Sequence, residues 1–327
     1  MLLFLPVATD TVKTRRSLRA FVSGGSAPNL TRLRLIAEAG LGVAGVIWGV
    51  NFVLVKFAME QMPALYYLGL RFLIAAVVLA PFSIGRLRRL NRTGWLLGVG
   101  VGALLFAGFI LQTYGLRLTS PGISGFLTSL YVIMVPLILG LASGRWPSPL
   151  VGIGVVVVVA GLALLSLYGH MGFGWGEGLT LLATVFWALH ILGVDYGSTR
   201  ISAIAFVELQ LATCAALSLV GSSIIERPTL FPGWEAMGAV LWTGIMGGVV
   251  AYVLMVLGQR YTPPTLAGLL MSLEAVFALI VSVIVGYDSL TLRTLTGFIL
   301  VFAGTTVARM GSEREPEMAA EPAPPAP

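Results

Sequence analysis

One carboxyl group, that of Glu274, lies at the middle of an apolar run, Thr265–Val285, which is long enough to cross a bilayer as a helix. About 20 apolar residues span the roughly 30 Å of hydrocarbon, because each helical residue rises about 1.5 Å. A charged side chain at that depth costs about 2.5–3.5 kcal/mol, so it faces the protein interior or a cavity rather than lipid. Glu274 is therefore either a structural carboxyl group bonded to a neighbouring helix or part of a polar pathway that contacts substrate or exchanges protons.

A counter-charge for that carboxyl group is available in Arg71, which lies six residues after the start of another apolar run, Leu65–Ile84. Six residues of helix span about 9 Å, so the guanidinium can still reach the membrane interface along its flexible stem. Alternatively it lines a cavity, where a guanidinium holds a carboxylate through two hydrogen bonds. In that case Arg71 either binds a substrate carboxylate or pairs with Glu274.

Two tryptophans are each followed, three residues later, by a polar side chain: Trp48 by Asn51, and Trp187 by His190. Residues three apart share one face of a helix. A tryptophan near a membrane interface is often an anchor, but the repeated polar partner favours the lining of a cavity. An imidazole titrates near neutrality, so His190 joins Glu274 as a candidate for proton coupling. The only other histidine, His170, falls in a connector, and we predict no metal site.

Further polar or amphipathic side chains lie within or at the ends of other apolar runs, whereas Glu208 and Lys56 are expected at the membrane interface. Each of these side chains alone is explained by contacts between helices. Together they indicate a polar interior that can hydrogen-bond a small solute. The predicted cavity residues are Trp48, Asn51, Arg71, Gln112, Tyr131, Trp187, His190, Gln210, Tyr252, Gln259 and Glu274.

The elements that must position these residues are transmembrane helices. The chain has 327 residues, of which 57% are hydrophobic and 10% are charged, whereas a soluble domain is about 25% charged. Short connectors leave no room for a sizeable soluble domain or for an active site outside the membrane. Ten apolar segments are expected: Leu35–Val55, Leu65–Ile84, Gly94–Tyr114, Gly122–Leu141, Leu150–Tyr168, Gly178–Val194, Ala203–Ile224, Ala236–Leu257, Thr265–Val285 and Leu292–Ala308. Segments one to four and six to nine should enclose the cavity. Segments five and ten, nearly free of polar groups, should lie at the periphery as support or as a homodimer contact.

The distribution of Lys and Arg predicts the orientation of the chain. If the segments alternate, fifteen of the twenty basic residues lie on one side and four on the other. Because basic residues are enriched in cytoplasmic connectors, both termini are predicted to be cytoplasmic in a multi-pass protein of the cell (inner) membrane. Residues 1–34 form a basic cytoplasmic extension, and residues 311–327, rich in Pro, Ala and Glu, are predicted to be a disordered cytoplasmic tail.

The two halves of the chain resemble each other. Ala44–Phe52 (AGVIWGVNF) matches Ala183–Ile191 (ATVFWALHI), and the same offset places Arg71 against Gln210. A later match, Gly125–Leu130 with Gly268–Leu273, sets Tyr131 against Glu274.

Two repeats follow from these matches, over residues 35–168 and 178–308. Five helices are an odd number, so the second repeat must start on the opposite side of the membrane. The predicted fold is therefore all-α and integral to the membrane, with ten transmembrane helices in two inverted five-helix repeats. In such folds substrate binds near the midplane, and one repeat rocks against the other to give alternating access.

The chain resembles the EamA group of the drug/metabolite transporter superfamily. The resemblance rests on the ten-helix repeat, on WG-x-N-F-x-x-x-K at Trp48–Lys56, on Arg71 in the second helix, and on LGQRYTPPTLAGLLMSLEAVFA at Leu257–Ala278. It covers about residues 35–310. One departure is Asp288, which stands where the family usually has Gly-Glu after the ninth helix. The resemblance implies export of small metabolites or drugs, often amino acids, commonly driven by the proton gradient.

Other functions remain open on the same sequence. An importer, exchanger or facilitator of small solutes would use the same fold, and a non-transporting scaffold is a further alternative. An intramembrane enzyme would need a nucleophile–base pair or paired catalytic carboxylates, and ATP hydrolysis would need a Gly-x4-Gly-Lys-Ser/Thr loop; the sequence contains neither. We expect no cofactor and no nucleic acid, and the expected partners are a small-molecule substrate and the lipid bilayer.

Overall fold

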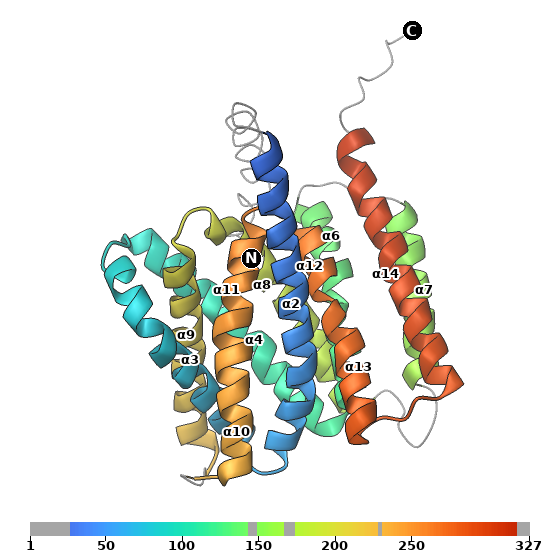
Figure 1. Ribbon diagram of the computed structural model, residues 1–327. Helices are drawn as coiled ribbons and strands as arrows, with labels where there is room; N and C mark the ends of the chain where they lie inside the picture. The colour runs from blue at the N-terminus through green and yellow to red at the C-terminus, as the bar shows by residue number, and fades with distance from the viewer. Residues whose placement is uncertain (1–26, 143–148, 167–173, 228–230, 319–327) are drawn as a thin grey trace.

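The computed structural model describes residues 27–142, 149–166, 174–227 and 231–318, and every regular element in these ranges is a helix. The helices pack side by side, roughly parallel or antiparallel to one another (Figure 1). Their bounds are α2 (Ala27–Met59), α3 (Ala64–Leu87), α4 (Arg92–Leu118), α5 (Pro121–Ser129), α6 (Tyr131–Ala142), α7 (Pro149–Ser166), α8 (Trp175–Ser198), α9 (Ala203–Ile225), α10 (Trp234–Trp242), η1 (Thr243–Val250), α11 (Ala251–Gln259), α12 (Pro264–Met271), α13 (Leu273–Val285) and α14 (Leu292–Met318).

Within the described ranges, eight helical stretches are long and apolar enough to cross a membrane. They contain the predicted segments one to four and six to nine, so the chain is a multi-pass membrane protein. Segments five and ten lie in α7 and α14, which are not among those eight stretches. The count of ten crossings and the inverted relation of the halves stay predictions.

Helix α2 starts at Ala27, eight residues before the predicted start of the first segment, and the preceding residues 1–26 lie outside the described part of the chain. At the other terminus α14 continues to Met318. Residues 311–318, at the start of the tail predicted to be disordered, continue this helix, because extending an existing helix adds one hydrogen bond for each residue that is fixed. The remaining tail, residues 319–327, lies outside the described residues.

Capping residues explain where several helices begin and end. Asn91 Oδ1 accepts a hydrogen bond of 2.8 Å from the Gly94 amide at the start of α4. Ser120 Oγ does the same for the Ile123 amide, at 3.3 Å, at the start of α5. Such side chains satisfy amide groups that have no partner within the helix. Helix α13 ends at Gly286, whose φ of 90° lies in the left-handed region that glycine enters without strain.

Three of the spanning stretches are not continuous α-helices. The stretch of predicted segment four is interrupted at Leu130, between α5 and α6, and that of predicted segment nine at Ser272, between α12 and α13. That of predicted segment eight contains the π-helical turns of η1 between α10 and α11. Tyr131 directly follows the first of these interruptions, and Glu274 lies two residues after the second. Interrupted and π-helical segments occur frequently at functional sites.

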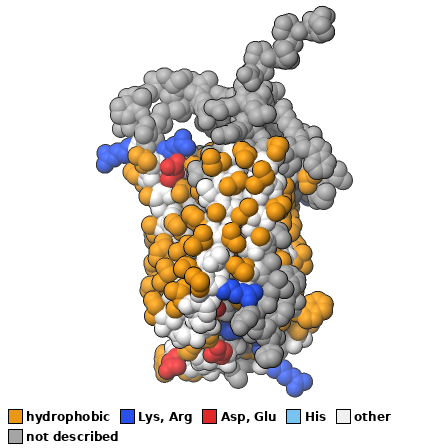
Figure 2. Space-filling model, turned by 90° about the vertical axis from the view of Figure 1, so that its right-hand side faces the viewer, with side chains coloured by type: hydrophobic (Ala, Val, Ile, Leu, Met, Phe, Trp, Pro, Cys, Tyr) orange, Lys and Arg blue, Asp and Glu red, His pale blue; other side chains and the backbone are white. Residues whose placement is uncertain are grey.

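Helices α7 and α14 pack against each other at one edge of the bundle (Figure 1). Their backbones approach closely at Gly304, where an added Cβ would lie 2.7 Å from the Gly154 carbonyl oxygen. On the face that includes this edge, hydrophobic side chains cover much of the surface and charged side chains lie toward its two ends (Figure 2). Such a surface suits a lipid environment.

Candidate functional site

A cavity lies at the centre of the bundle, between helices of both halves. Its lining comes from α2, α3, α4, α5, α6, α8, α11, α12 and α13, whereas the peripheral helices α7 and α14 contribute nothing to it. The lining residues are Trp48, Asn51, Phe52, Val55, Arg71, Phe109, Gln112, Thr113, Leu116, Thr128, Tyr131, Trp187, His190, Ile191, Tyr252, Met255, Met271 and Glu274. The predicted contribution of segment seven is wrong, because α9 lies behind α3 and α4 and packs against both.

Nine of the eleven predicted residues line this cavity; Gln210 and Gln259 do not. Gln210 lies on α9 and is fully buried behind the wall, where its Oε1 is 2.7 Å from Nε2 of His190. Its amide nitrogen donates to the Phe206 carbonyl at 3.0 Å, which holds the side chain in place. Gln210 thus positions His190 rather than facing a solute. Gln259 is buried at the last residue of α11, one turn beyond the lining residue Met255.

The cavity also contains residues that were not predicted, and all of them except Thr113 lie three or four positions from one that was. Phe109 precedes Gln112 by three residues, Thr128 precedes Tyr131 by three, and Met271 precedes Glu274 by three. Thr128 accepts a hydrogen bond of 2.8 Å from Gln112 Nε2. Helical spacing around the predicted residues is therefore the signal that would have found them. Glu208, expected at the membrane interface, is buried and does not line the cavity.

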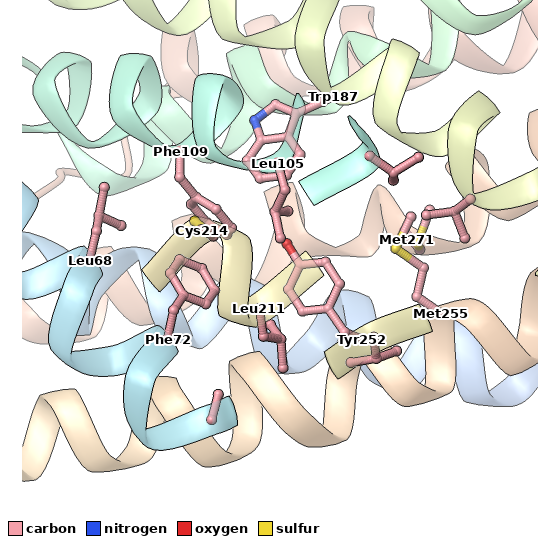
Figure 3. Packing of buried hydrophobic residues seen from close by; sticks show 14 of the residues in the cluster. Leu68, Phe72, Leu105, Phe109, Trp187, Leu211, Cys214, Tyr252, Met255 and Met271 are labelled. Atoms are coloured by element: carbon pink, nitrogen blue, oxygen red, sulfur yellow. The ribbon is translucent and has the colours of Figure 1, made fainter. Parts of the chain in front are cut away.

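Aromatic rings form much of the cavity wall. Phe109 lies between Phe72 and Trp187, with ring centroids 4.9 and 4.7 Å away (Figure 3). The ring centroid of Tyr252 lies 5.1 Å from that of Trp48 and 6.0 Å from that of His190. Tilted and edge-to-face pairs at these distances stabilise each other beyond the area they bury. The wall offers flat apolar surfaces with polar edges, suited to the apolar part of a small solute.

Arg71 is buried among these rings. Its side chain is 2% exposed, and its Cζ lies 4.6 and 4.8 Å from the ring centroids of Phe72 and Phe109. The guanidinium therefore does not extend to the membrane interface. This leaves the hypothesis that Arg71 lines the cavity. Within the described residues no carboxylate forms an ion pair with it, and its Nε has no hydrogen-bond partner. The cation is held by aromatic faces and remains available to an anion in the cavity.

Glu274 lies in the first turn of α13 and is 4% exposed. Tyr131 lies beside its carboxyl group. The carboxyl Oε1 finds no hydrogen-bond partner among the described residues. A purely structural carboxyl group would have both oxygens satisfied, because an unpaired buried polar atom costs about 1–3 kcal/mol. Glu274 and Arg71 thus face one cavity without pairing with each other.

The two tryptophans of the repeated pattern differ in their hydrogen bonding. Trp48 Nε1 donates to the Gly247 carbonyl in η1 at 3.0 Å. Trp187 Nε1 has no partner within the described part of the chain, and neither amide atom of Asn51 has one. Buried polar atoms are nearly always hydrogen-bonded to protein, water or ligand. The cavity therefore presents donors and acceptors that a polar solute or water can satisfy.

The free space inside the cavity is about 60 Å³, which is room for a few water molecules. A metabolite of ordinary size needs more space, so the surrounding helices must separate or the aromatic side chains must rotate before it enters. No group of three or more His, Cys, Asp or Glu side chains in the described ranges is arranged to hold a metal ion. The arrangement suits binding and passage of a small solute.

Two stretches of the chain, residues 36–167 and 174–310, match the model of the EamA-like transporter family. Among curated relatives, an uncharacterized transporter of Archaeoglobus fulgidus is 29% identical over 282 residues, covering 85% of this chain and 87% of the relative. The uncharacterized inner membrane transporter YedA of Escherichia coli K12 is 24% identical over 269 residues, covering 79% and 86%. A solved structure titled only as a crystal structure of a protein covers 85% of this chain and 98% of its own, with a TM-score of 0.66 and 22% identity. That likeness concerns the fold.

Proposed function

Because the chain belongs to the EamA-like transporter family, we propose that it is a secondary active transporter that exports small metabolites, such as amino-acid-like solutes, or drugs across the cytoplasmic membrane. Its relatives are described as transporters, and its central cavity is lined from both halves of the chain. In the described ranges the chain forms only this helical bundle, so we place the solute path through it.

The observation that carries this proposal is that two buried ionisable groups line the cavity without forming an ion pair with each other. Arg71 offers a permanent cation, and Glu274 offers a carboxyl group with a free oxygen. A solute with a carboxylate and an ammonium group would satisfy both, with its carboxylate at Arg71 and its ammonium at Glu274. Its side chain would then lie against the rings of Phe109, Trp187 and Tyr252.

Alternating access between two inverted repeats is the proposed mechanism. Two separate family matches support the duplication, and an odd number of helices per repeat inverts the second copy. The excess of basic residues on one side supports cytoplasmic termini. Rocking of the halves would widen the narrow cavity first on one side and then on the other.

Proton coupling is proposed at Glu274, with His190 as the second candidate. A carboxyl group can carry a proton in one direction and a solute ammonium in the other, because both occupy the same free oxygen. His190 is fully buried beside Trp187 and Tyr252, and its Nδ1 has no partner within the described residues. Its Nε2 is already engaged by Gln210, which favours Glu274 as the exchanging group.

The test is proton release from purified protein in detergent when amino acids or amphipathic drugs are added. The wild type should release protons on binding, and Glu274→Gln should bind without release. Glu235→Gln is the matched control, because Glu235 is exposed on α10 and outside the cavity. Equal release from wild type and Glu274→Gln would move the coupling to His190. Binding without release from either protein would contradict the coupled mechanism and favour facilitated diffusion.

Import, exchange or facilitated passage of the same solutes is the alternative on this fold. Transport measured in right-side-out and inside-out vesicles distinguishes these from export. Absence of flux for every solute in both kinds of vesicle would instead favour a non-transporting scaffold.

A further inference from the structure

Several carboxylates outside the cavity lie at one end of the bundle, the lower end in Figure 1, where α2, α4, α9 and α13 terminate. Two of them, Glu226 and Asp288, follow helices of the second half and bond to helices of the first. Neither belongs to the cavity or to the proposed proton path. Their hydrogen bonds indicate what they do.

Glu226 follows α9 and caps the beginning of α3. Its Oε1 accepts a hydrogen bond of 2.9 Å from the Leu65 amide, and its Oε2 accepts one of 2.8 Å from the Tyr66 amide. The Tyr114 hydroxyl on α4 and the Ser222 hydroxyl also donate to it, at 3.3 and 2.9 Å. Helix α3 needs this cap, because its own N-cap residue is a proline without a side-chain acceptor. A negative charge is favourable at a helix N-terminus.

Asp288 follows α13 and caps the beginning of α5 in the same way. Its Oδ2 accepts hydrogen bonds from the Gly122 amide at 2.9 Å and from the Ser282 hydroxyl at 2.5 Å. The close approach depends on glycine at this position, since a Cβ on Gly122 would lie 2.5 Å from the same oxygen. Asp288, in the second half, therefore contacts the first turn of α5, in the first half.

The two caps join corresponding segments of the two halves. The repeat places Arg71 of α3 against Gln210 of α9, and the start of the fourth segment against that of the ninth. Glu226 thus links α9 to its counterpart α3, and Asp288 links α13, at the end of the ninth segment, to α5, at the start of the corresponding fourth segment. At the same end Lys56 Nζ, on α2, donates to carbonyl oxygens of Leu116, Arg117 and Thr119 at the end of α4, at 2.9–3.0 Å.

The opposite end of the bundle differs. There, among the described residues, Arg34 bonds to Glu38 on its own helix, and Arg200, just after α8, donates to the Tyr196 carbonyl of α8. Arg260 reaches further, donating to the Ile201 carbonyl at 2.8 Å. Glu208 on α9 interacts there with the Ser83 hydroxyl on α3. At the lower end, by contrast, Glu226 and Asp288 accept hydrogen bonds from the first amides of helices in the other half.

We propose that Glu226 and Asp288 are latches that hold the two halves together at the lower end and release when the cavity opens there. The proposal rests on the transport function proposed above. Opening at this end requires α3 to separate from α9 and α5 from α13, so the four amide and hydroxyl bonds between halves must break. Closing restores two charge-assisted caps, which makes the closed end a defined state.

The test measures access to the cavity with a single cysteine. Cys214 is the only cysteine and is buried, so Cys214→Ser with Thr113→Cys places one thiol in the cavity wall. A membrane-impermeant maleimide is added to intact cells and, separately, to inside-out vesicles. Glu226→Gln and Asp288→Asn should each raise the labelling rate roughly fivefold from one side only, because a neutral acceptor bonds about half as strongly as a charged one.

Glu235→Gln is the control at the same end, since Glu235 is exposed in the first turn of α10, and it should leave the rate unchanged. Unchanged labelling of the latch variants together with a lower melting temperature would overturn the proposal, because the carboxylates would then only stabilise helix ends. If the latch variants do not fold, Tyr114→Phe removes one contact of Glu226 and decides by the same readout. Labelling needs neither substrate nor proton gradient, so this test and the proton-release test fail independently.

Discussion

At the scale of single residues, Arg71 decides which solutes the cavity can hold. Its guanidinium lies between the rings of Phe72 and Phe109 and has no counter-ion in the described part of the chain. Lysine keeps the charge but lacks the planar fork that stacks on rings and binds a carboxylate twice. The identity of this side chain, and not only its charge, should therefore matter.

We expect Arg71→Lys to weaken binding of an amino acid about tenfold or more, because a hydrogen bond to a charged group contributes about 1.5–3 kcal/mol. Arg71→Gln should also abolish the preference for phenylalanine over phenethylamine, which lacks the carboxylate. Titration calorimetry of the purified variants measures both effects. Arg200→Lys is the matched control, since Arg200 stacks on Tyr196 at an exposed site. An unchanged preference in Arg71→Gln would contradict the assignment of a substrate carboxylate to this residue.

At the scale of an element, the π-helical segment η1 packs against residues that line the cavity without lining it itself. An added Cβ on Gly247 would lie 1.9 Å from Asn51 Nδ2, and one on Gly244 would lie 2.7 Å from the Arg71 carbonyl. The carbonyl of Gly247 also receives the Trp48 indole hydrogen bond. The glycines of this segment therefore let α2 and α3 approach it and place two cavity side chains.

Gly247→Ala should displace Asn51 and lower solute affinity several-fold, with a loss of stability of about 1–3 kcal/mol from overpacking. Gly238→Ala on α10 is the control: nothing lies within 4 Å of its added Cβ, so it should gain up to about 1 kcal/mol from helix propensity alone. Thermal unfolding and binding are measured on both variants. Unaltered affinity in Gly247→Ala would show that the cavity tolerates movement of this wall.

At the scale of the whole molecule, the open question is whether α7 crosses the membrane. It is apolar throughout and packs along α14, and ten crossings require it to span. A cysteine at position 170, after α7, would then lie on the opposite side from one at position 145, before it. These two positions lie outside the described residues, so their sides are predicted from the sequence alone.

We expect a Cys214→Ser chain with His170→Cys to react with an impermeant maleimide in intact cells, and the chain with Arg145→Cys to react only in inside-out vesicles. Green fluorescent protein fused to the C-terminus should fluoresce, since it matures in the cytoplasm. Labelling of both cysteines from the same side would mean that α7 does not cross. The chain would then cross the membrane fewer than ten times. Termini on the same side would still require an even number of crossings.

The sequence by itself determined that this chain is a multi-pass helical membrane protein of the EamA-like family. It also identified nine of the residues around the cavity. Length and hydropathy mark a spanning helix, and a polar side chain within one must face protein, so Asn51, Arg71 and Glu274 stand out without a structure.

Only the tertiary structure decided which face of each helix meets which neighbour. It buried Arg71 among rings rather than at the interface, placed Gln210 behind His190, and gave Glu226 and Asp288 their contacts with α3 and α5. The contacts of Glu226 and Asp288 join segments more than a hundred residues apart. Local pattern cannot specify them, because they depend on how close the backbones of separate helices approach.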